Sequence, residues 1–353
     1  MRDDDRLDDR LDDPFDDRFD DRFDDLIASL GGFTRTWLIY LGLELGLFDR
    51  LRAAGEAGLS PARLAEASGT TSEAIDVWSW AADAHGLATL TDDRLMVDPE
   101  LAAILLDGER PDFLGGQFMH TVVASMDWGG LADFFRSGVA IASRPDRYRE
   151  AIQRLTTQDI AVFFQEALAE LPQLVADLAR GGRVLDVHSG GGMWLIALAR
   201  RFERIEAVGV EFEPDSVARA RRNVEAAGLD RRITIEQGDV SSPGHHGEFD
   251  LAYFQYALHQ LHDAAGALRA AWAALRPGGR LLVLDWPLPS TQEEFRTRHG
   301  ELIAGVQLDE LYQGTALATR EQFRGWFREA GLPEPQLVDL PSGASLFLAT
   351  RTG

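Results

Sequence analysis

The chain has 353 residues, 45% of them hydrophobic and 26% charged, an ordinary composition for a globular protein with room for two domains. Its formal net charge is -23, which argues against a nucleic-acid partner because phosphate binding needs a basic surface. It has no cysteine, and its 35 basic residues are all arginine. These absences exclude thiolate nucleophiles, cysteine-held metals, Schiff-base lysines and phosphate loops of the lysine type.

The sequence shows no segment of the kind that inserts into a membrane. Its apolar runs stay short of the roughly 18 residues needed to span a bilayer. The N-terminus is acidic from its third residue and lacks the apolar centre of a signal peptide. We therefore expect a cytoplasmic protein with no membrane partner.

Residues 1–25 form a low-complexity acidic segment in which the unit Asp-Asp-Arg-Leu/Phe recurs. So dense a run of acids repels itself, and the composition favours a solvated, disordered tail. The alternative is a helix, because apolar residues recur every four positions and would form one stripe. Such a stripe would dock on a partner or on the other subunit of a dimer, and Pro14 would interrupt it.

Residues 26–110 are expected to form a small helical domain. Ser60 precedes Pro61 in the pattern of a capping residue followed by proline at the first helical position. A further helix is expected over 72–85, and residues 87–97 have the pattern of a two-stranded ribbon. Three helices and a ribbon are a winged-helix pattern, but the helix over 72–85 holds three acids and no arginine. DNA binding is therefore disfavoured on electrostatic grounds.

Residues 111–180 are expected to be mostly helical and to link the first domain to the next. The part between His120 and Phe135 is rich in aromatic residues. These residues would pack between two domains or, alternatively, line a substrate pocket, since pockets favour domain junctions and aromatic walls. His120 and Trp128 are the candidates for such a lining.

Strands and helices alternate over residues 181–353. This alternation predicts a mostly parallel sheet with helices on both faces. The last two strands lie close together around Pro341-Ser342-Gly343, so the last strand should pair antiparallel. The predicted fold class is α/β, with a Rossmann-like seven-stranded, mostly parallel sheet preceded by a mainly helical, winged-helix-like domain. Strands are expected at 183–188, 206–212, 232–237, 249–255, 279–286, 335–340 and 345–350.

An acid stands at or just after the end of each of the first three strands of this sheet: Asp186, Glu211 and Asp239. Ligands of open parallel sheets bind at this edge. An acid about 20 residues past the glycine turn can accept hydrogen bonds from ribose hydroxyls. An acid after the third strand can accept one from an adenine amino group. The three acids in register indicate an adenosine ligand.

The glycine turn after the first strand distinguishes between adenosine cofactors. The run from Gly190 lacks the third glycine of the dinucleotide pattern G-x-G-x-x-G, and Leu195 stands there. Asp186 leads the turn, and an acid there suits an ammonium group better than a pyrophosphate. The sequence therefore favours S-adenosylmethionine (SAM) over NAD.

Residues 183–350 resemble a class I SAM-dependent methyltransferase. The glycine turn is similar to the family's D-x-G-x-G-x-G motif, and segments 249–259 and 275–283 resemble its fourth-strand motif and the turn into its fifth strand. The whole chain is similar to small-molecule methyltransferases of the O-methyltransferase type, which implies a homodimer whose first domain serves dimerisation and covers the substrate. The resemblance implies cofactor contacts at Asp186, Gly190, Gly192, Glu211, Phe212, Asp239, Val240 and Gln255.

The chain departs from the family's motif at His188, which stands where the first glycine is usual. A side chain there projects where the backbone would closely approach the methionine half of the cofactor. Three interpretations stay open. The residue is a tolerated substitution that points away from the ligand, or it hydrogen-bonds the cofactor carboxylate or the substrate, or it marks a protein that no longer transfers methyl groups.

His259 follows the fourth strand on the ligand side and resembles the histidine that serves as the base in O-methyltransferases. A neutral histidine can take a proton at neutral pH. The alternative is that His259 only caps or packs. His262 could share a helical face with it. His299 and Tyr312, in the segment 290–318 after the fifth strand, could reach the pocket from a lid.

A magnesium site of the kind that some small methyltransferases have is a further alternative. Asp285, Asp309 and Glu310 are the possible ligands, but no ligand spacing supports them. No metal is therefore predicted.

These features together predict a SAM-dependent methyltransferase that acts on a hydroxyl of an aromatic or polyketide-like small molecule. Two alternatives stay open. One is a SAM-binding protein that does not transfer methyl groups, and the other is an acidic winged-helix interaction module with a degenerate enzyme domain. Binding of SAM would distinguish the first two hypotheses from the interaction module. Methyl transfer would then distinguish the methyltransferase from the SAM-binding protein that does not transfer methyl groups.

Overall fold

The computed structural model describes residues 14–241 and 244–352. The chain divides into two compact units between Ala103 and Ile104. The segment 111–180, predicted as a linker, packs within the second unit together with the sheet. The reason is that its apolar residues, among them Val162 and Phe163, belong to the core on one face of that sheet.

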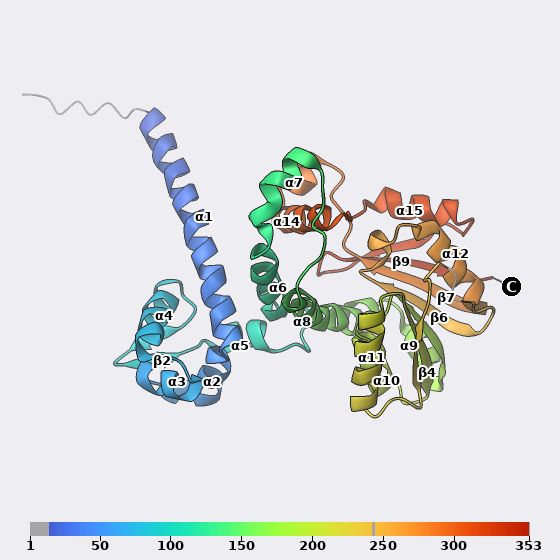
Figure 1. Cartoon of the computed structure of the whole chain (residues 1–353), viewed down its shortest axis with the longest axis horizontal. Coiled ribbons are helices and arrows are strands. Elements are labelled where there is room, and N and C mark those ends of the chain that lie inside the picture. Colours follow the sequence, from blue (N-terminus) through green and yellow to red (C-terminus); the bar gives the residue numbers. More distant parts are fainter. Residues whose placement is uncertain (1–13, 242–243, 353) are drawn as a thin grey trace, which may run out of the picture. The chain divides into compact units, whose positions relative to one another are not determined.

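The first unit is helical with one two-stranded sheet (Figure 1). Ser60 accepts the backbone N–H of Arg63 at 3.3 Å, so the expected cap is present. Phe48 and Trp78 meet edge to face in the core, with ring centroids 5.6 Å apart. The winged-helix assignment stays a prediction. The elements are α1 (Pro14–Glu44), α2 (Leu47–Ala54), α3 (Pro61–Ser68), α4 (Ser72–Ala84), β1 (Thr89–Thr91) and β2 (Arg94–Met96), and α5 (Pro99–Leu106) leads into the second unit.

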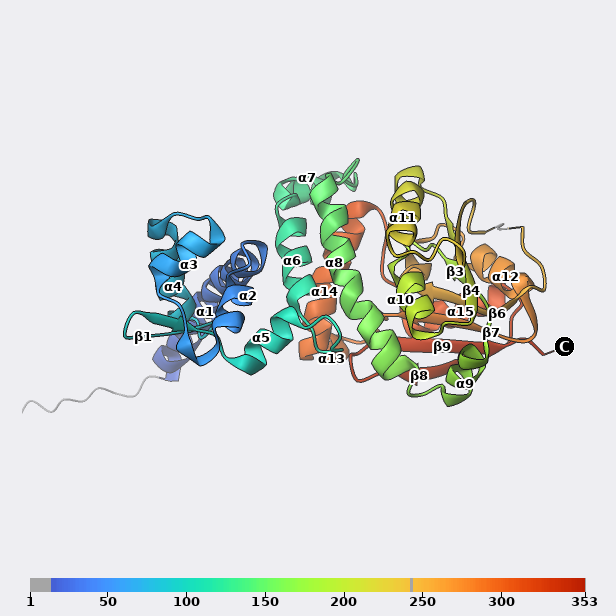
Figure 2. The same ribbon diagram turned by 90° about the horizontal axis from the view of Figure 1, so that it is seen from below.

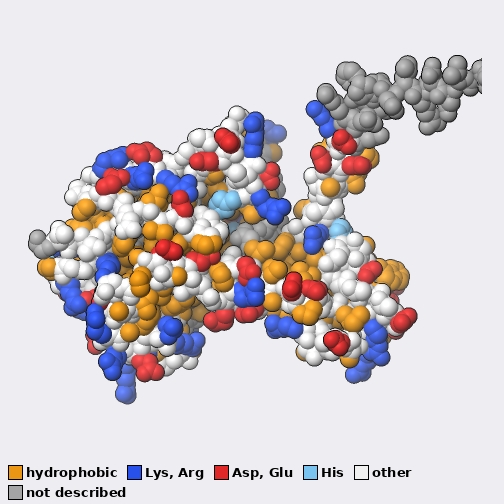
Figure 3. Space-filling view, turned by 180° about the vertical axis from the view of Figure 1, so that it is seen from behind, with side chains coloured by type: hydrophobic (Ala, Val, Ile, Leu, Met, Phe, Trp, Pro, Cys, Tyr) orange, Lys and Arg blue, Asp and Glu red, His pale blue; other side chains and the backbone are white. Residues whose placement is uncertain are grey.

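Helix α1 differs from the disordered tail that composition favoured for residues 1–25, because the chain is helical from Pro14 onward. Proline is favourable at the first position of a helix, where its missing N–H would have no partner in any case. Pro14 therefore stands at the first described position of the helix, where proline is tolerated. The earlier part of the predicted tail, residues 1–13, lies outside the described residues. Apolar side chains of α1 reach the surface (Figure 3), and four that are more than half exposed are Phe23, Leu26, Leu30 and Phe33.

The same helix corrects the expectation that every apolar segment is too short to span a bilayer. Among the described residues, the stretch Asp21–Glu44 is long and apolar enough to cross a membrane by length and composition, and 17% of its most apolar window is buried. The stretch Asp21–Glu44 meets the membrane-span criterion through its mean hydropathy, although polar residues occur along it. Core helices of soluble proteins meet the same criterion, so the finding carries little weight by itself.

The second unit is built on a seven-stranded sheet in the order β5-β4-β3-β6-β7-β9-β8. Neighbouring strands run parallel except β9, which is antiparallel to both β7 and β8. This confirms the predicted fold class, including the antiparallel last strand. The strands are β3 (Gly182–Val187), β4 (Ile205–Glu211), β5 (Ile233–Gln237), β6 (Phe249–Gln255), β7 (Leu275–Asp285), β8 (Gln336–Asp339) and β9 (Ser345–Thr350).

Helices cover both faces of this sheet (Figure 2), as parallel strands buried on two sides require. One core lies under α9 (Pro172–Arg180), α10 (Met193–Arg201) and α11 (Pro214–Ala226). The other core lies under α12 (Ala264–Ala274) and α15 (Arg320–Glu329). Each fully buried Leu or Phe in these cores contributes about 1.5–3 kcal/mol, which fixes the sheet and the positions of its strand ends.

A further group of helices packs at the edge of the sheet where the parallel strands end. Helices α6 and α8 pack together and lie beside α14 (Figures 1 and 2). A π-helical turn over Phe163–Ala167 continues α8 toward the sheet. These helices lie across a pocket from the ends of β3 and β4, which carry Asp186 and Glu211. The helices are α6 (Gly115–Ser125), α7 (Leu131–Ser137), α8 (Asp146–Val162), α13 (Gln292–Phe295) and α14 (Arg298–Gln313).

Candidate active site

A pocket of about 340 Å³ opens at the carboxyl ends of β3, β4, β6 and β7, within the second unit. Residues at and after the strand ends form one side of it, and α6, α8 and α14 form the other. Its volume lies in the range of small-molecule sites. The lining includes Gln117, His120, Tyr148, Arg149, Asp159, Asp186, His188, Gly190, Glu211, Glu213, Arg219, Gln255, Tyr256, His259, Asp285, Trp286, Val306, Glu310 and Leu317.

The turn after β3 places His188 beside the end of β4. The backbone N–H groups of His188 and Ser189 both donate to the carbonyl of Val210, at 2.9 and 3.1 Å. His188 has φ +66°, a left-handed conformation that is uncommon for residues other than glycine. The turn therefore keeps a glycine-type backbone although a side chain is present.

Glu211, at the end of β4, is 1% exposed and accepts four hydrogen bonds. Its Oε2 accepts from the Gly190 N–H at 2.9 Å and from His188 Nδ1 at 2.8 Å. Its Oε1 accepts from the N–H groups of Phe212 and Glu213, at 2.9 and 3.0 Å. Burial raises the pKa of Glu211, but His188 and the backbone donors lower it by more, so the pKa lies below its usual value.

Two other acids of the pocket have the opposite tendency. Asp186, at the end of β3, is 3% exposed, and burial together with the charge of Glu211 raises its pKa to about 8. Asp159, on α8, is 8% exposed, and burial and the charge of Asp285 raise its pKa well above the usual value. Asp186 therefore holds a proton at neutral pH, and a bound cation would favour the ionised form of both carboxyls.

His259 and Asp285 form a buried pair on the other half of the pocket. His259 lies on the 3-10 turn Leu258–Gln260 after β6, and Asp285 ends β7. Nδ1 of His259 lies 2.9 Å from each carboxylate oxygen of Asp285. Nε2 is buried and has no hydrogen-bond partner among the described residues. A ring held through one nitrogen, with the other free inside a pocket, can accept a proton from a ligand.

The surroundings of this pair set the basicity of the imidazole. Burial lowers the pKa of His259, but the charge and hydrogen bond of Asp285 and the charge of Glu310 raise it by more. The pKa of His259 therefore lies above its usual value. Because Asp285 is acceptor-only when ionised, Nδ1 carries the proton of the neutral ring and Nε2 carries the lone pair.

The pocket lining holds more acidic than basic side chains. Six acids line it: Asp159, Asp186, Glu211, Glu213, Asp285 and Glu310. The two arginines in the lining are Arg149 and Arg219, and Arg149 already pairs with Asp146 at 2.8 Å and with Glu213 at 3.5 Å. Such a pocket suits a cationic ligand better than a pyrophosphate.

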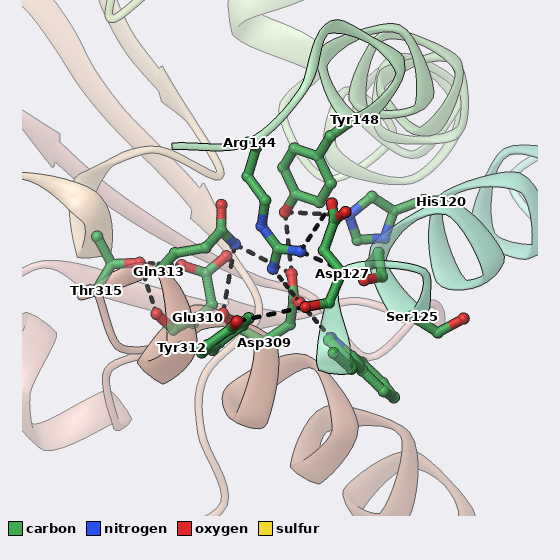
Figure 4. A network of polar contacts seen from close by, with 12 residues as sticks. His120, Ser125, Asp127, Arg144, Tyr148, Asp309, Glu310, Tyr312, Gln313 and Thr315 are labelled. Carbon is green, nitrogen blue, oxygen red and sulfur yellow. Dashed lines mark hydrogen bonds and ion pairs between the residues drawn. The ribbon is translucent and has the colours of Figure 1, made fainter. Parts of the chain in front are cut away.

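A buried polar network beside the pocket ties α14 to the segment between α6 and α8 (Figure 4). Asp309 of α14, 4% exposed, accepts hydrogen bonds from Trp128 Nε1 at 2.7 Å and from Tyr148 Oη at 3.0 Å. Arg144 forms a buried ion pair with Asp309, and its guanidinium lies 4.4 Å from the centre of the Tyr148 ring. Because Glu310 follows Asp309, this network also fixes the acid that faces His259.

The structure brings seven of the predicted site residues into one pocket lining: His120, Asp186, His188, Gly190, Glu211, Gln255 and His259. It places the other predicted site residues outside the lining.

Trp128 and Tyr312 belong to the network around Arg144 and Asp127, next to the lining. His262 and Asp239 are exposed, Val240 is buried in a core, and Gly192 begins α10. Phe212 is 55% exposed and its ring lies 5.4 Å from that of His188. His299 packs against Gly343, where a Cβ would lie 2.4 Å from its Cε1.

Sequence reasoning missed Asp159, Arg149, Tyr148 and Trp286 as members of the lining. Asp159 had one signal, since it stands at the start of the apolar run Ile160-Ala161-Val162-Phe163 and is buried with it. Asp285 and Glu310 were considered only as metal ligands. In the structure Asp285 pairs with His259, and Asp309 pairs with Arg144. Among the described residues, no group of three or more His, Asp and Glu side chains could hold a metal ion.

Comparison with known proteins matches the part of the chain that carries the glycine turn and the strand ends on one side of this site. Residues 184–279 match the model of the methyltransferase domain family. The demethylmenaquinone methyltransferase of Thermus thermophilus is 36% identical over 107 residues, which are 30% of this chain and 48% of that protein. The 27-O-demethylrifamycin SV methyltransferase of Amycolatopsis mediterranei is 29% identical over 188 residues, 51% of this chain and 65% of that protein.

A solved structure of PigF with SAH has the same fold over almost the whole chain. The TM-score is 0.72 at 20% identity, covering 93% of this chain and 99% of that one. The chain spans about half of the length of the first two curated relatives it matches, 48% of each. The matched segment includes the glycine turn, Glu211 and the turn that carries His259. Residues 184–279 of this chain are a methyltransferase domain.

Proposed function

We propose that this chain binds SAM and transfers its methyl group to a hydroxyl of a small-molecule acceptor. The observation that carries the proposal is that one pocket holds both the glycine turn with its acids and the His259–Asp285 pair with Nε2 unpartnered. Hydroxyl methylation needs a bound cofactor and an oriented base in one cavity. The methyltransferase domain at residues 184–279 supports the same reaction.

The chemistry of the pocket fits SAM, which carries a sulfonium and an ammonium group. The excess of acids favours such a cation, and Asp186 is the acid nearest to the glycine turn along the chain. Ser189 Oγ and Gln255 Oε1 are buried without a partner among the described residues. A polar ligand would satisfy them. We assign the methionine end of the cofactor to this group. We assign its adenine end to Phe212, Asp239 and Val240, which lie outside the lining but follow β4 and β5 at the same edge of the sheet.

The residues of this chain would then carry the reaction as follows. Bound SAM would supply an electrophilic methyl group to the acceptor oxygen and would leave as SAH. His259 Nε2 accepts the hydroxyl proton, and Asp285 stabilises the positive charge that this proton brings to the ring. A positioned base of this kind contributes about 10²–10⁴ in rate, and orientation of the reactants contributes roughly 7–11 kcal/mol.

The acceptor side of the pocket suits an aromatic or polyketide-like molecule. The rings of His120, Tyr148 and Trp286 line it together with the apolar side chains of Val306 and Leu317. Burial lowers the pKa of His120, and Arg144 lowers it further although Asp309 raises it, so this ring is neutral and adds no charge. Pockets lined by aromatic rings bind planar apolar ligands well.

The test has two steps, cofactor binding and turnover. Calorimetric titration should show binding of SAM and of its demethylated product S-adenosylhomocysteine (SAH), with NADH as the competing candidate. Radiolabelled methyl transfer from SAM to a panel of hydroxylated aromatic compounds should then be lost in His259→Ala. His246→Asn, at an exposed histidine outside the pocket, is the control. Tighter binding of NADH than of SAM overturns the cofactor, and full activity of His259→Ala overturns the base. SAM binding with no transfer to any acceptor of the panel would favour a SAM-binding protein without methyl transfer.

We further propose that the chain is a homodimer located in the cytoplasm. The exposed apolar face of α1 supports the dimer, because contiguous apolar surface marks interaction sites. Light scattering should give twice the mass of one chain. The double variant Leu26→Glu with Leu30→Glu should give the mass of one chain, and a monomeric wild-type protein at micromolar concentration would refute the dimer.

A further inference from the structure

The acid that SAM-type sites use for ribose is already saturated in this chain. A carboxylate has about four lone-pair sites, and Glu211 fills all four with donors of its own chain. Three of the donors are backbone N–H groups of Gly190, Phe212 and Glu213, which are held by the turns they belong to. The fourth is the side chain of His188, so this residue occupies the acceptor position that a ribose hydroxyl would otherwise use.

The geometry of His188 offers a replacement for that position. The pKa of Glu211 lies below its usual value, so this carboxylate is the acceptor and Nδ1 of His188 is the donor. Nε2 can accept a hydrogen bond from a hydroxyl, or donate one to it when the ring carries a second proton. Nε2 lies on the opposite side of the ring from this bond and has no hydrogen-bond partner among the described residues. The His188 ring lines the pocket, and its side chain is 20% exposed. The hydrogen bond to Glu211 and the contact with the Phe212 ring, whose centroid lies 5.4 Å away, hold the imidazole in its orientation.

The backbone shows that this arrangement is held in place. His188 keeps φ +66°, which disfavours any side chain with a Cβ, and the bond to a buried carboxylate offsets that strain. If His188 swung away to free Glu211, the strain would remain and its compensation would be lost. A ligand is therefore expected to meet the imidazole and not the carboxylate.

We propose that His188 Nε2, in place of Glu211, is the hydrogen-bond partner of a ribose hydroxyl of the bound cofactor. The inference rests on the proposed SAM site and names the residue that recognises the sugar there. His188 is then a specificity-determining residue, because it hydrogen-bonds the ribose hydroxyl while Glu211 holds the imidazole in position. The interpretation open for this position named the cofactor carboxylate or the substrate, and the ribose hydroxyl is a different contact with the cofactor.

The test measures binding of SAH and of its 2′-deoxy and 3′-deoxy forms by calorimetry, so no acceptor is needed. Removing the hydroxyl that His188 contacts should weaken binding to the wild-type protein about 5- to 10-fold, the effect of one net hydrogen bond. His188→Asn tolerates the left-handed backbone and can still donate to Glu211, but it has no ring nitrogen to offer. In this variant the penalty for the missing hydroxyl should fall below twofold.

His188→Gly separates the two candidate partners. Glycine adopts φ +66° without strain and leaves one Oε2 lone pair of Glu211 open, so the penalty for the missing hydroxyl should return. His246→Asn is the matched control and should behave as the wild type. The inference is overturned if the wild type shows no penalty, if His188→Asn keeps the full penalty, or if His188→Gly shows no more penalty than His188→Asn. Failure of SAH itself to bind the wild type would instead overturn the proposed function.

Discussion

Asp186 should make the second unit less stable as the pH rises, and Asp186→Asn should remove that effect. The pKa of this buried carboxyl is raised to about 8, whereas an aspartate in the unfolded chain titrates near 3.8. Between these values the unfolded chain releases the proton and the folded chain keeps it. The stability that the neutral carboxyl contributes is therefore fully present below pH 3.8 and is lost as the pH rises through about 8.

The size of the effect follows from the two pKa values. With about 1.36 kcal/mol per pKa unit, the contribution of Asp186 falls by roughly 2–3 kcal/mol between pH 5 and pH 7. Asp186→Asn cannot ionise, so its free energy of unfolding relative to the wild type should rise by that amount over the same interval. For a unit of this size the difference between the two melting temperatures should change by roughly 4–12 °C.

Differential scanning calorimetry of the ligand-free protein at pH 5, 6 and 7 measures this difference. Asp215→Asn is the control, because Asp215 is an exposed acid in the first turn of α11. Its melting temperature relative to the wild type should not change with pH. If Asp186→Asn differs from the wild type by the same number of degrees at pH 5 and pH 7, the carboxyl is not held neutral by burial and the reasoning is refuted.

Two further predictions concern the pairs around the pocket. Asp285→Asn should lower kcat about 10- to 100-fold. The acidic limb of the pH–rate profile should move to lower pH, because the charge that raises the pKa of His259 is gone. An acidic limb that stays at the same pH would contradict the assignment of His259 as the base. Arg144→Ala should lower the free energy of unfolding of the second unit by about 3–5 kcal/mol, since it leaves Asp309 buried without its cation. Arg147→Ala, which removes a half-exposed partner of Asp127, should lower it by less than about 1 kcal/mol, and equal losses in a denaturant titration would argue against a special role for the buried pair.

The sheet could be predicted from the sequence because its signals are local. Apolar runs of strand length alternate with helical patterns, and each predicted strand lies within a few residues of an observed one. Asp186, Glu211 and His259 could be placed on one edge for the same reason, since parallel strands end together. The local strand pattern was enough to predict that these residues lie at the same edge of the sheet.

What the sequence could not indicate depends on contacts between distant segments. Arg144 and Asp309 are 165 positions apart, and nothing local marks either as buried. Asp159 reaches the pocket only because α8 packs against the strand ends. His188 was recognised as a departure from the motif, but its bond to Glu211 required the strand register that sets the turn beside β4. Helix α1 was obscured for another reason, because composition favoured disorder over the apolar stripe that the helix carries.

The buried acids connect the stability of the second unit to the ligand that it binds. Burial raises the pKa of both Asp159 and Asp186, and neither carboxyl has a cationic partner among the described residues. Keeping them costs stability at neutral pH, so packing alone does not explain their presence. A ligand that brings positive charge into the pocket would stabilise the ionised form, and binding it would release protons. Stabilisation by SAM should therefore grow as the pH rises from 6 to 8, whereas a neutral ligand of the same pocket would show no such trend.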